Sequence, residues 1–89
     1  MKKTGQLADR NLIGGRIRKA RLACVPHVRQ EDLAGRLAAR GILIDQTAVY
    51  RIENQDRYLM DYEIIAIAKA LKVSVAFLFG ESSKLKERT

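Results

Sequence analysis

The sequence predicts an all-α fold organised as one domain of about five short helices. Its 89 residues leave room for a single hydrophobic core, which excludes two domains. Apolar side chains recur mainly at helical spacing rather than in the alternation typical of strands. The hydrophobic (47%) and charged (30%) fractions are ordinary for a folded globular protein.

A first helix is expected to begin near Asn11, whose side chain can cap it. One apolar stripe follows at helical spacing: Ile13, Ile17, Ala20 and Cys24. The Gly14-Gly15 pair inside this helix indicates either tolerated flexibility or close packing. Pro26 and its neighbours end the helix, because proline disfavours helical geometry at the residue before it.

Two further helices are expected in the middle of the chain. The second runs from about Gln30 to Arg40, with acidic residues in its first turn and Gly41 at its end. Residues 42–44 are apolar but too few for a helix, so we expect a turn held against the core. Asp45 then caps a third helix from Gln46 to about Asn54.

The fourth and fifth helices complete the domain. Asp61 is expected to cap the fourth, which follows a loop over residues 54–57. Its apolar stripe consists of Ile64, Ile67, Ala68 and Leu71. Ser74 caps a short fifth helix that ends at Gly80.

The net charge of +7 and a sequence pI near 10.0 favour a polyanionic partner, with a membrane surface as the second candidate. The first 40 residues hold 10 basic and 3 acidic residues, whereas the other 49 hold 7 of each. This excess can form one phosphate-attracting face. Several of its bases can equally form a solubilising face: Lys2, Lys3, Arg10, Arg16 and Arg18.

Other classes of protein are disfavoured. Cys24 and His27 have a spacing seen in metal sites but lack two further ligands, so we expect no metal and place Cys24 in the core. We find no nucleophile with an orienting base, and therefore expect neither an enzyme nor a cofactor or small-molecule ligand. No secretory signal pattern or segment of about 20 apolar residues occurs, so we expect a cytoplasmic location and no segment that crosses a membrane.

The third helix has the composition of a base-reading element. Only Ala48, Val49 and Ile52 are available for burial, while its other side carries polar residues. Glutamine can pair bidentately with adenine and arginine with guanine in the major groove. Ala34 on the second helix, with Val49 and Ile52, supplies the small and apolar contacts that two steeply crossing helices need.

Four blocks carry a family resemblance: IRKAR at 17–21, QEDLA at 30–34, TAVYRIEN at 47–54 and IAKALKVS at 67–74. In this order they resemble the phage-repressor and Cro-like helix-turn-helix regulators, the XRE family, over about Ile13 to Gly80. The resemblance implies a compact five-helix lambda-repressor-like DNA-binding domain at 11–80. We expect a flexible basic arm (1–10) before this domain and a polar tail (81–89) after it.

The resemblance also implies which residues contact DNA. Three match positions that meet base edges: Gln46, Thr47 and Arg51. Tyr50 and Asn54 lie where base or phosphate contacts are common, although Asn54 can instead end the helix and Tyr50 can pack on a partner subunit. Gln30 would contact the DNA backbone and brace a base-reading residue, and two arginines complete the set: Arg29 and Arg57.

The resemblance further implies that Arg21 and Glu53 form a buried ion pair joining the first helix to the end of the third. The chain departs from the family pattern in three places. The segment from Ala34 to Val49 is about five residues longer, which predicts a longer second helix and a reshaped turn. Arg29 replaces the usual Ser or Thr cap, and Gln55 replaces a glycine, so Asn54 or Gln55 must adopt left-handed geometry.

The expected function is sequence-specific binding of double-stranded DNA through Gln46 to Asn54, regulating transcription as a repressor. A homodimer is expected, with Tyr58-Leu59-Met60 and Ile65 either sealing the core or forming the dimer surface. The alternative is an antitoxin-like or adaptor module that uses the same fold to hold a protein. Nonspecific nucleic-acid binding driven by net charge is a third possibility.

Overall fold

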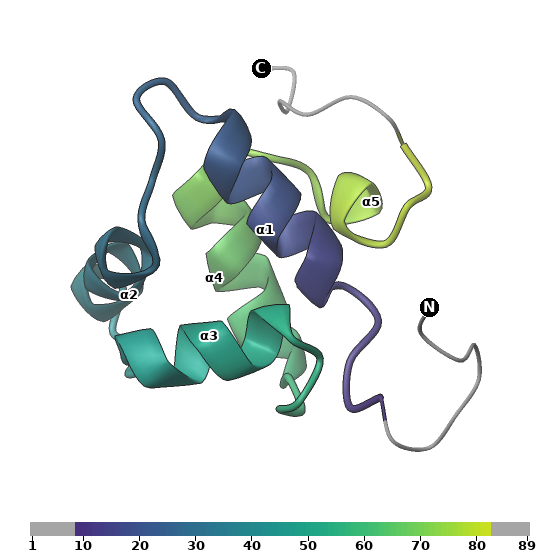
Figure 1. Ribbon diagram of the computed structural model, residues 1–89, viewed down its shortest axis with the longest axis horizontal. Coiled ribbons are helices and arrows are strands. Elements are labelled where there is room, and N and C mark those ends of the chain that lie inside the picture. Colours follow the sequence, from purple (N-terminus) through teal and green to yellow (C-terminus); the bar gives the residue numbers. More distant parts are fainter. Residues whose placement is uncertain (1–8, 83–89) are drawn as a thin grey trace.

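Five helices surround one core in the computed structural model, which describes residues 9–82 (Figure 1). They are α1 (Gly14–Ala23), α2 (Gln30–Ala39), α3 (Gln46–Glu53), α4 (Asp61–Leu71) and α5 (Val75–Leu78). Residues 9–82 contain no strand, so the predicted all-α class is confirmed. Most of the expected N-terminal arm, with Lys2 and Lys3, and most of the expected tail lie outside the described residues.

Polar side chains begin three of the helices as predicted. Asn11, Asp45 and Ser74 each accept a hydrogen bond from a backbone N–H in the first turn of α1, α3 and α5, at 2.8, 2.9 and 2.9 Å. The prediction that Asp61 caps α4 is wrong. The Glu63 carboxylate instead accepts the N–H of Met60 at 2.9 Å, because an acid in the first turn can reach back to the preceding residue.

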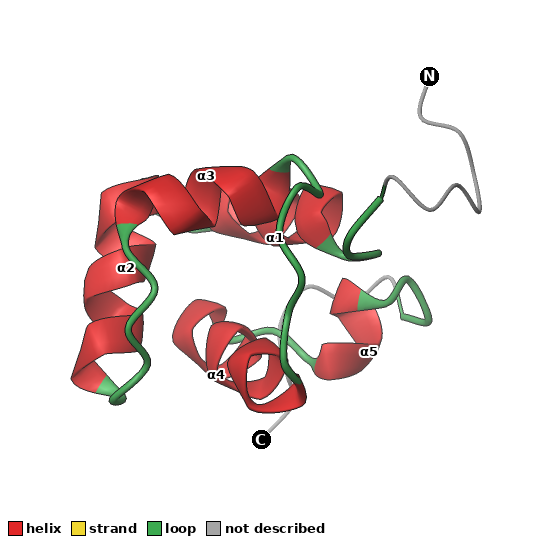
Figure 2. Cartoon of the chain, turned by 90° about the horizontal axis from the view of Figure 1, so that it is seen from below, coloured by secondary structure: helices red, strands yellow, loops and turns green. Residues whose placement is uncertain are grey.

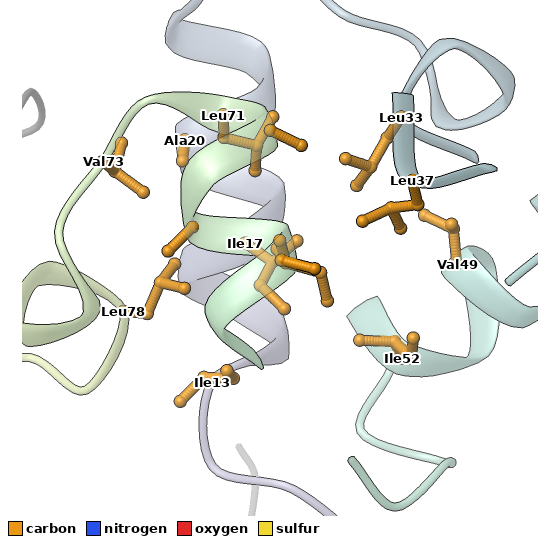
Figure 3. Close-up of a cluster of buried hydrophobic side chains, with 14 of the residues drawn as sticks. Ile13, Ile17, Ala20, Leu33, Leu37, Val49, Ile52, Leu71, Val73 and Leu78 are labelled. Atoms are coloured by element: carbon orange, nitrogen blue, oxygen red, sulfur yellow. The ribbon is translucent and has the colours of Figure 1, made fainter. Parts of the chain in front are cut away.

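The core joins the apolar faces of all five helices (Figure 3). Its largest fully buried side chains come from every element: Ile13, Ile17, Leu33, Leu37, Val49, Ile52, Ile67, Phe77 and Leu78. The turn after α2 is held against this core as predicted, since Ile44 is buried and Ile42 packs on the cluster. Leu43 between them is 89% exposed. Cys24 is only partly buried, at the edge of the core.

Helix α3 lies across one end of the domain, at the bottom of Figure 1 and nearest the viewer in Figure 2, which looks from below. The start of α1 meets the end of α3 backbone to backbone. A Cβ atom on Gly14 would overlap the carbonyl oxygen of Ile52 and lie 3.0 Å from that of Glu53. Nothing lies within 4 Å of a Cβ atom on Gly15. Close packing therefore explains Gly14 and does not explain Gly15.

Replacing Gly14 with Ala is expected to lower the free energy of unfolding by about 1–3 kcal/mol, because the added methyl group must push two backbones apart. The matched Gly15→Ala variant adds the same methyl group to an exposed position of the same helix. It should gain stability, by up to about 1 kcal/mol, through helix propensity. Urea unfolding of both variants measures the difference, and equal stabilities would contradict the close approach of α1 and α3.

Candidate nucleic-acid interface

Helix α3 has one buried face and one polar face. Val49 and Ile52 are each 1% exposed and hold the helix against the core. The polar face presents the predicted base-reading and neighbouring residues to solvent: Gln46, Thr47, Tyr50, Arg51 and Asn54. A helix held on one side and polar on the other presents a row of hydrogen-bonding groups at the surface.

A buried ion pair fixes the C-terminal end of α3. The Arg21 guanidinium donates two hydrogen bonds to the Glu53 carboxylate, Nε to Oε2 at 2.7 Å and Nη2 to Oε1 at 2.9 Å. Its third donor, Nη1, binds the carbonyl oxygen of Val28 at 2.9 Å. Both side chains are buried, and residues 9–82 contain no buried side-chain nitrogen or oxygen without a partner. The pair therefore joins α1, α3 and the segment before α2.

The ion pair continues to the surface through two glutamines. Gln30 Nε2 donates to Glu53 Oε1 at 3.1 Å, and Gln46 Nε2 donates to Gln30 Oε1 at 2.8 Å. The amide oxygen of Gln46 and its second N–H are not used in these bonds. Those are the acceptor and donor that pairing with adenine requires. The buried carboxylate thus orients the first residue of α3 through Gln30.

Arg51 is held by a surface contact instead. Its Nη2 donates to the Asp56 carbonyl oxygen at 3.0 Å, and its Nε lies 3.6 Å from Asp56 Oδ2. Asp56 also accepts a hydrogen bond from Arg10 at 3.1 Å. Their side chains are all about half exposed, so these pairs contribute little stability and weaken in salt. The Arg51 guanidinium can therefore leave Asp56 when a stronger acceptor approaches.

The remaining polar side chains of α3 differ in whether they already form hydrogen bonds within the protein. The Asn54 side chain donates to the carbonyl oxygen of Tyr50 at 2.9 Å, which supports its role at the helix end. Within residues 9–82, the side chains of Thr47 and Tyr50 have no hydrogen-bond partner. Those two side chains can accept new partners without losing existing hydrogen bonds.

The two other predicted arginines are engaged in ion pairs. Arg29 contacts Glu31 and Asp32, each at 3.2 Å. Hydrogen bonds from the backbone N–H and guanidinium of Arg29 lower the pKa of Asp32. Arg57 is 27% exposed and lies 3.2 Å from the Glu63 carboxylate. The structure therefore does not bring Arg57 into the polar row of α3 as a free cation.

The left-handed residue after α3 is Gln55, with φ of 60°. The sequence predicted left-handed geometry at either Asn54 or Gln55, because Gln55 stands where the family pattern has a glycine. Its side-chain amide donates to the Asn11 carbonyl oxygen at 2.9 Å, and its own carbonyl oxygen accepts the N–H of Arg10 at 3.0 Å. Contacts with the segment before α1 therefore hold a conformation that glutamine disfavours.

Two structural roles of charged residues were missed in the sequence. The sequence predicts a solubilising or phosphate-attracting face for Arg16, but its guanidinium lies 4.4 Å from the centre of the Phe77 ring and its Nε donates to the Phe77 carbonyl oxygen. The Arg57–Glu63 pair was also missed. The spacing of Glu63 three residues after Met60 is that of a capping box and indicates the bond to the Met60 N–H, but it gives no sign of the pair with Arg57.

Neither family models, nor curated proteins, nor solved structures gave a match to this chain. In the described part of the chain, no three His, Cys, Asp or Glu side chains are grouped so that they could bind a metal ion. None of the helices within residues 9–82 has the length and apolar character needed to cross a bilayer.

Replacing Glu53 with Ala is expected to lower the free energy of unfolding by about 3–5 kcal/mol, because it leaves the buried Arg21 charge unpaired. The fall in melting temperature, followed by circular dichroism, measures this loss. Asp61→Ala is the control, since it removes an exposed carboxylate from the start of α4 and should change stability by less than about 1 kcal/mol. A neutral Glu53→Ala result would contradict a stabilising role for the ion pair between α1 and α3.

Acid should weaken the fold partly through Glu63. Burial disfavours the charged Glu63 carboxylate, but hydrogen bonds from Arg57 and from the Met60 N–H outweigh burial and lower its pKa below the ordinary 4.5. Because the folded-state pKa is lowered, this contribution to stability is complete above the unfolded pKa and is lost as the pH falls through the folded pKa. Melting temperatures of the wild type and Glu63→Gln should therefore differ at pH 7 and converge as the pH falls well below 4.5. A difference that is constant with pH would contradict this assignment.

Proposed function

We propose that this protein binds double-stranded DNA sequence-specifically by placing α3 in the major groove, and that it regulates transcription as a repressor. The observation that carries the proposal is the hydrogen-bonded chain from the buried Arg21–Glu53 pair through Gln30 to exposed Gln46. A base-reading side chain must be held in a defined orientation to discriminate between bases. These hydrogen bonds orient the Gln46 side chain from the buried ion pair.

The dimensions of α3 suit this role. With eight residues the helix is roughly 12 Å long, and an α-helix with its side chains is about 10–12 Å across, which fits the major groove of about 12 Å. Gln46 and Thr47 occupy its first turn, which is the part of a recognition helix that meets base edges in helix-turn-helix proteins. The positive end of the α3 dipole also faces the incoming phosphates in this arrangement.

The resemblance to the phage-repressor and Cro-like family supports the same proposal for the fold. Its four sequence blocks fall on α1, α2, α3 and the end of α4 in the expected order. We therefore propose a lambda-repressor-like domain whose helix-turn-helix consists of α2 and α3. The longer connection between them carries exposed Leu43 and returns to the core at Ile44.

A homodimer would extend recognition over two half-sites about 34 Å apart. Exposed apolar side chains at the end of the α3–α4 loop and on α4 are candidates for its contact surface: Tyr58, Met60, Tyr62 and Ile65. Leu59 is excluded from that surface because it packs against the core. The same exposed residues favour the alternative, an antitoxin-like or adaptor module that holds another protein.

The DNA-binding proposal predicts a preference of about 10³-fold or more for one duplex sequence over unrelated DNA. Selection of bound fragments from randomised DNA identifies that sequence, and fluorescence anisotropy then measures its affinity. Replacing Arg51 with Ala should relax the preference at one base pair by about 1–3 kcal/mol.

Lys19→Ala is the matched control, since it removes an equal charge from an exposed position of α1. It should weaken binding to all sequences alike and leave the preference intact. Equal wild-type binding to every duplex would contradict sequence-specific regulation and favour binding by net charge. Absence of DNA binding at about 50 mM salt would favour the protein-interaction module.

A further inference from the structure

A groove of about 720 Å³ lies away from α3, where three helices end. It is formed by the loop over residues 24–28, the last turns of α2 and the end of α4. In Figure 1 the α1–α2 loop is at the top of the domain and α3 at the bottom. A molecule in this groove would therefore not occupy the polar face of α3.

Basic side chains dominate the groove. Four line it: Arg36, Arg40, Lys69 and Lys72. Arg36 Nη1 donates to the Ala70 carbonyl oxygen at 2.8 Å, whereas Arg40, Lys69 and Lys72 have no acidic partner within residues 9–82. The only acidic side chain in the lining, Asp32, is already paired with Arg29 outside it.

The negative ends of the three helix dipoles offset only part of the positive charge in the groove. A helix C-terminus carries a partial negative charge of about half a unit, so the ends of α1, α2 and α4 together offset about 1.5 of the four positive charges. Asp32 and Glu31 share the single charge of Arg29, so Asp32 cancels up to one further positive charge and an excess of at least about 1.5 charges remains. Positive charge therefore remains in the groove after the helix ends and Asp32 are counted, and it can attract an anionic group.

The groove also contains exposed apolar surface beside these bases. Val25 is 96% exposed, Pro26 follows it, and Ala39 at the end of α2 also lines the groove. Contacts to a DNA backbone are mostly hydrogen bonds to its phosphates and sugars, and such contacts do not require exposed aliphatic side chains beside the basic residues. A peptide that alternates carboxylates with aliphatic side chains matches both parts of the surface.

We propose that this groove docks an acidic, amphipathic peptide segment of a partner protein. Carboxylates of the segment pair with Arg40, Lys69 and Lys72, and its aliphatic side chains cover Val25 and Pro26. Because the groove lies away from α3, peptide and DNA can be held together. The proposal does not rest on DNA binding and can be tested separately from it.

The probe is a fluorescein-labelled 14-residue peptide with leucine at every third or fourth position and glutamate elsewhere, measured by anisotropy with the full chain. A matched peptide carries glutamine in place of glutamate. The acidic peptide is expected to bind at least about tenfold more tightly than the glutamine peptide, because charge complementarity is lost in the latter. Similar affinities for both peptides would overturn the proposal.

Charge reversal locates the site. Arg40→Glu with Lys72→Glu should weaken acidic-peptide binding by about tenfold or more, while Arg18→Glu with Lys19→Glu makes the same charge change on α1 and should alter it by less than about threefold. Val25→Ser should also weaken binding without changing the charge. The five substituted side chains are all solvent-exposed and make no hydrogen bond or ion pair within residues 9–82, and circular dichroism verifies that each variant is folded.

Two results would overturn the proposal. Equal losses in the two charge-reversed variants would mean that net charge alone attracts the peptide. Displacement of the peptide by a short duplex at equal phosphate and carboxylate concentrations would assign the groove to nucleic acid instead.

Discussion

The fold depends on satisfying one buried carboxylate. Glu53 lies at the end of α3, where its buried carboxylate accepts two hydrogen bonds from Arg21 on α1 and a third from Gln30 on α2. Removing any of these donors leaves an acceptor poorly solvated in the interior. The three helices are therefore fixed relative to one another by a polar contact as well as by apolar packing. The backbone contact at Gly14 fixes the same pair, α1 and α3, at a second point.

The polar face of α3 consequently has two kinds of residue. Gln46 is oriented by hydrogen bonds that lead to the buried pair, so its geometry is set before any partner arrives. Arg51 is held by Asp56 at the surface, in a contact that water and salt compete for. Binding would cost little side-chain entropy at Gln46 and would require rearrangement at Arg51. In the proposed complex, Gln46 would contact a base in an orientation that is already set, whereas Arg51 would change its conformation on binding.

The sequence predicted much of this arrangement because its strongest signals are local. Asn11, Asp45 and Ser74 cap helices through neighbours two or three residues away, and the buried stripes follow from helical periodicity. The Arg21–Glu53 pair was expected only through the family resemblance, since 32 residues separate its partners. Arg16 on Phe77, 61 residues away, left no such signal. Whether an arginine faces solvent or a distant carbonyl is decided by tertiary packing, which spacing does not encode.

Chemical-shift mapping of the ¹⁵N-labelled protein with the duplex enriched from randomised DNA tests the central claim most directly. The account predicts that the side-chain amides of Gln46 and Gln30 and the backbone amides of α3 shift together, while those around Lys69 and Lys72 stay unchanged. Saturating binding with shifts confined to the α1–α2 loop and the end of α4, and none on α3, would contradict it.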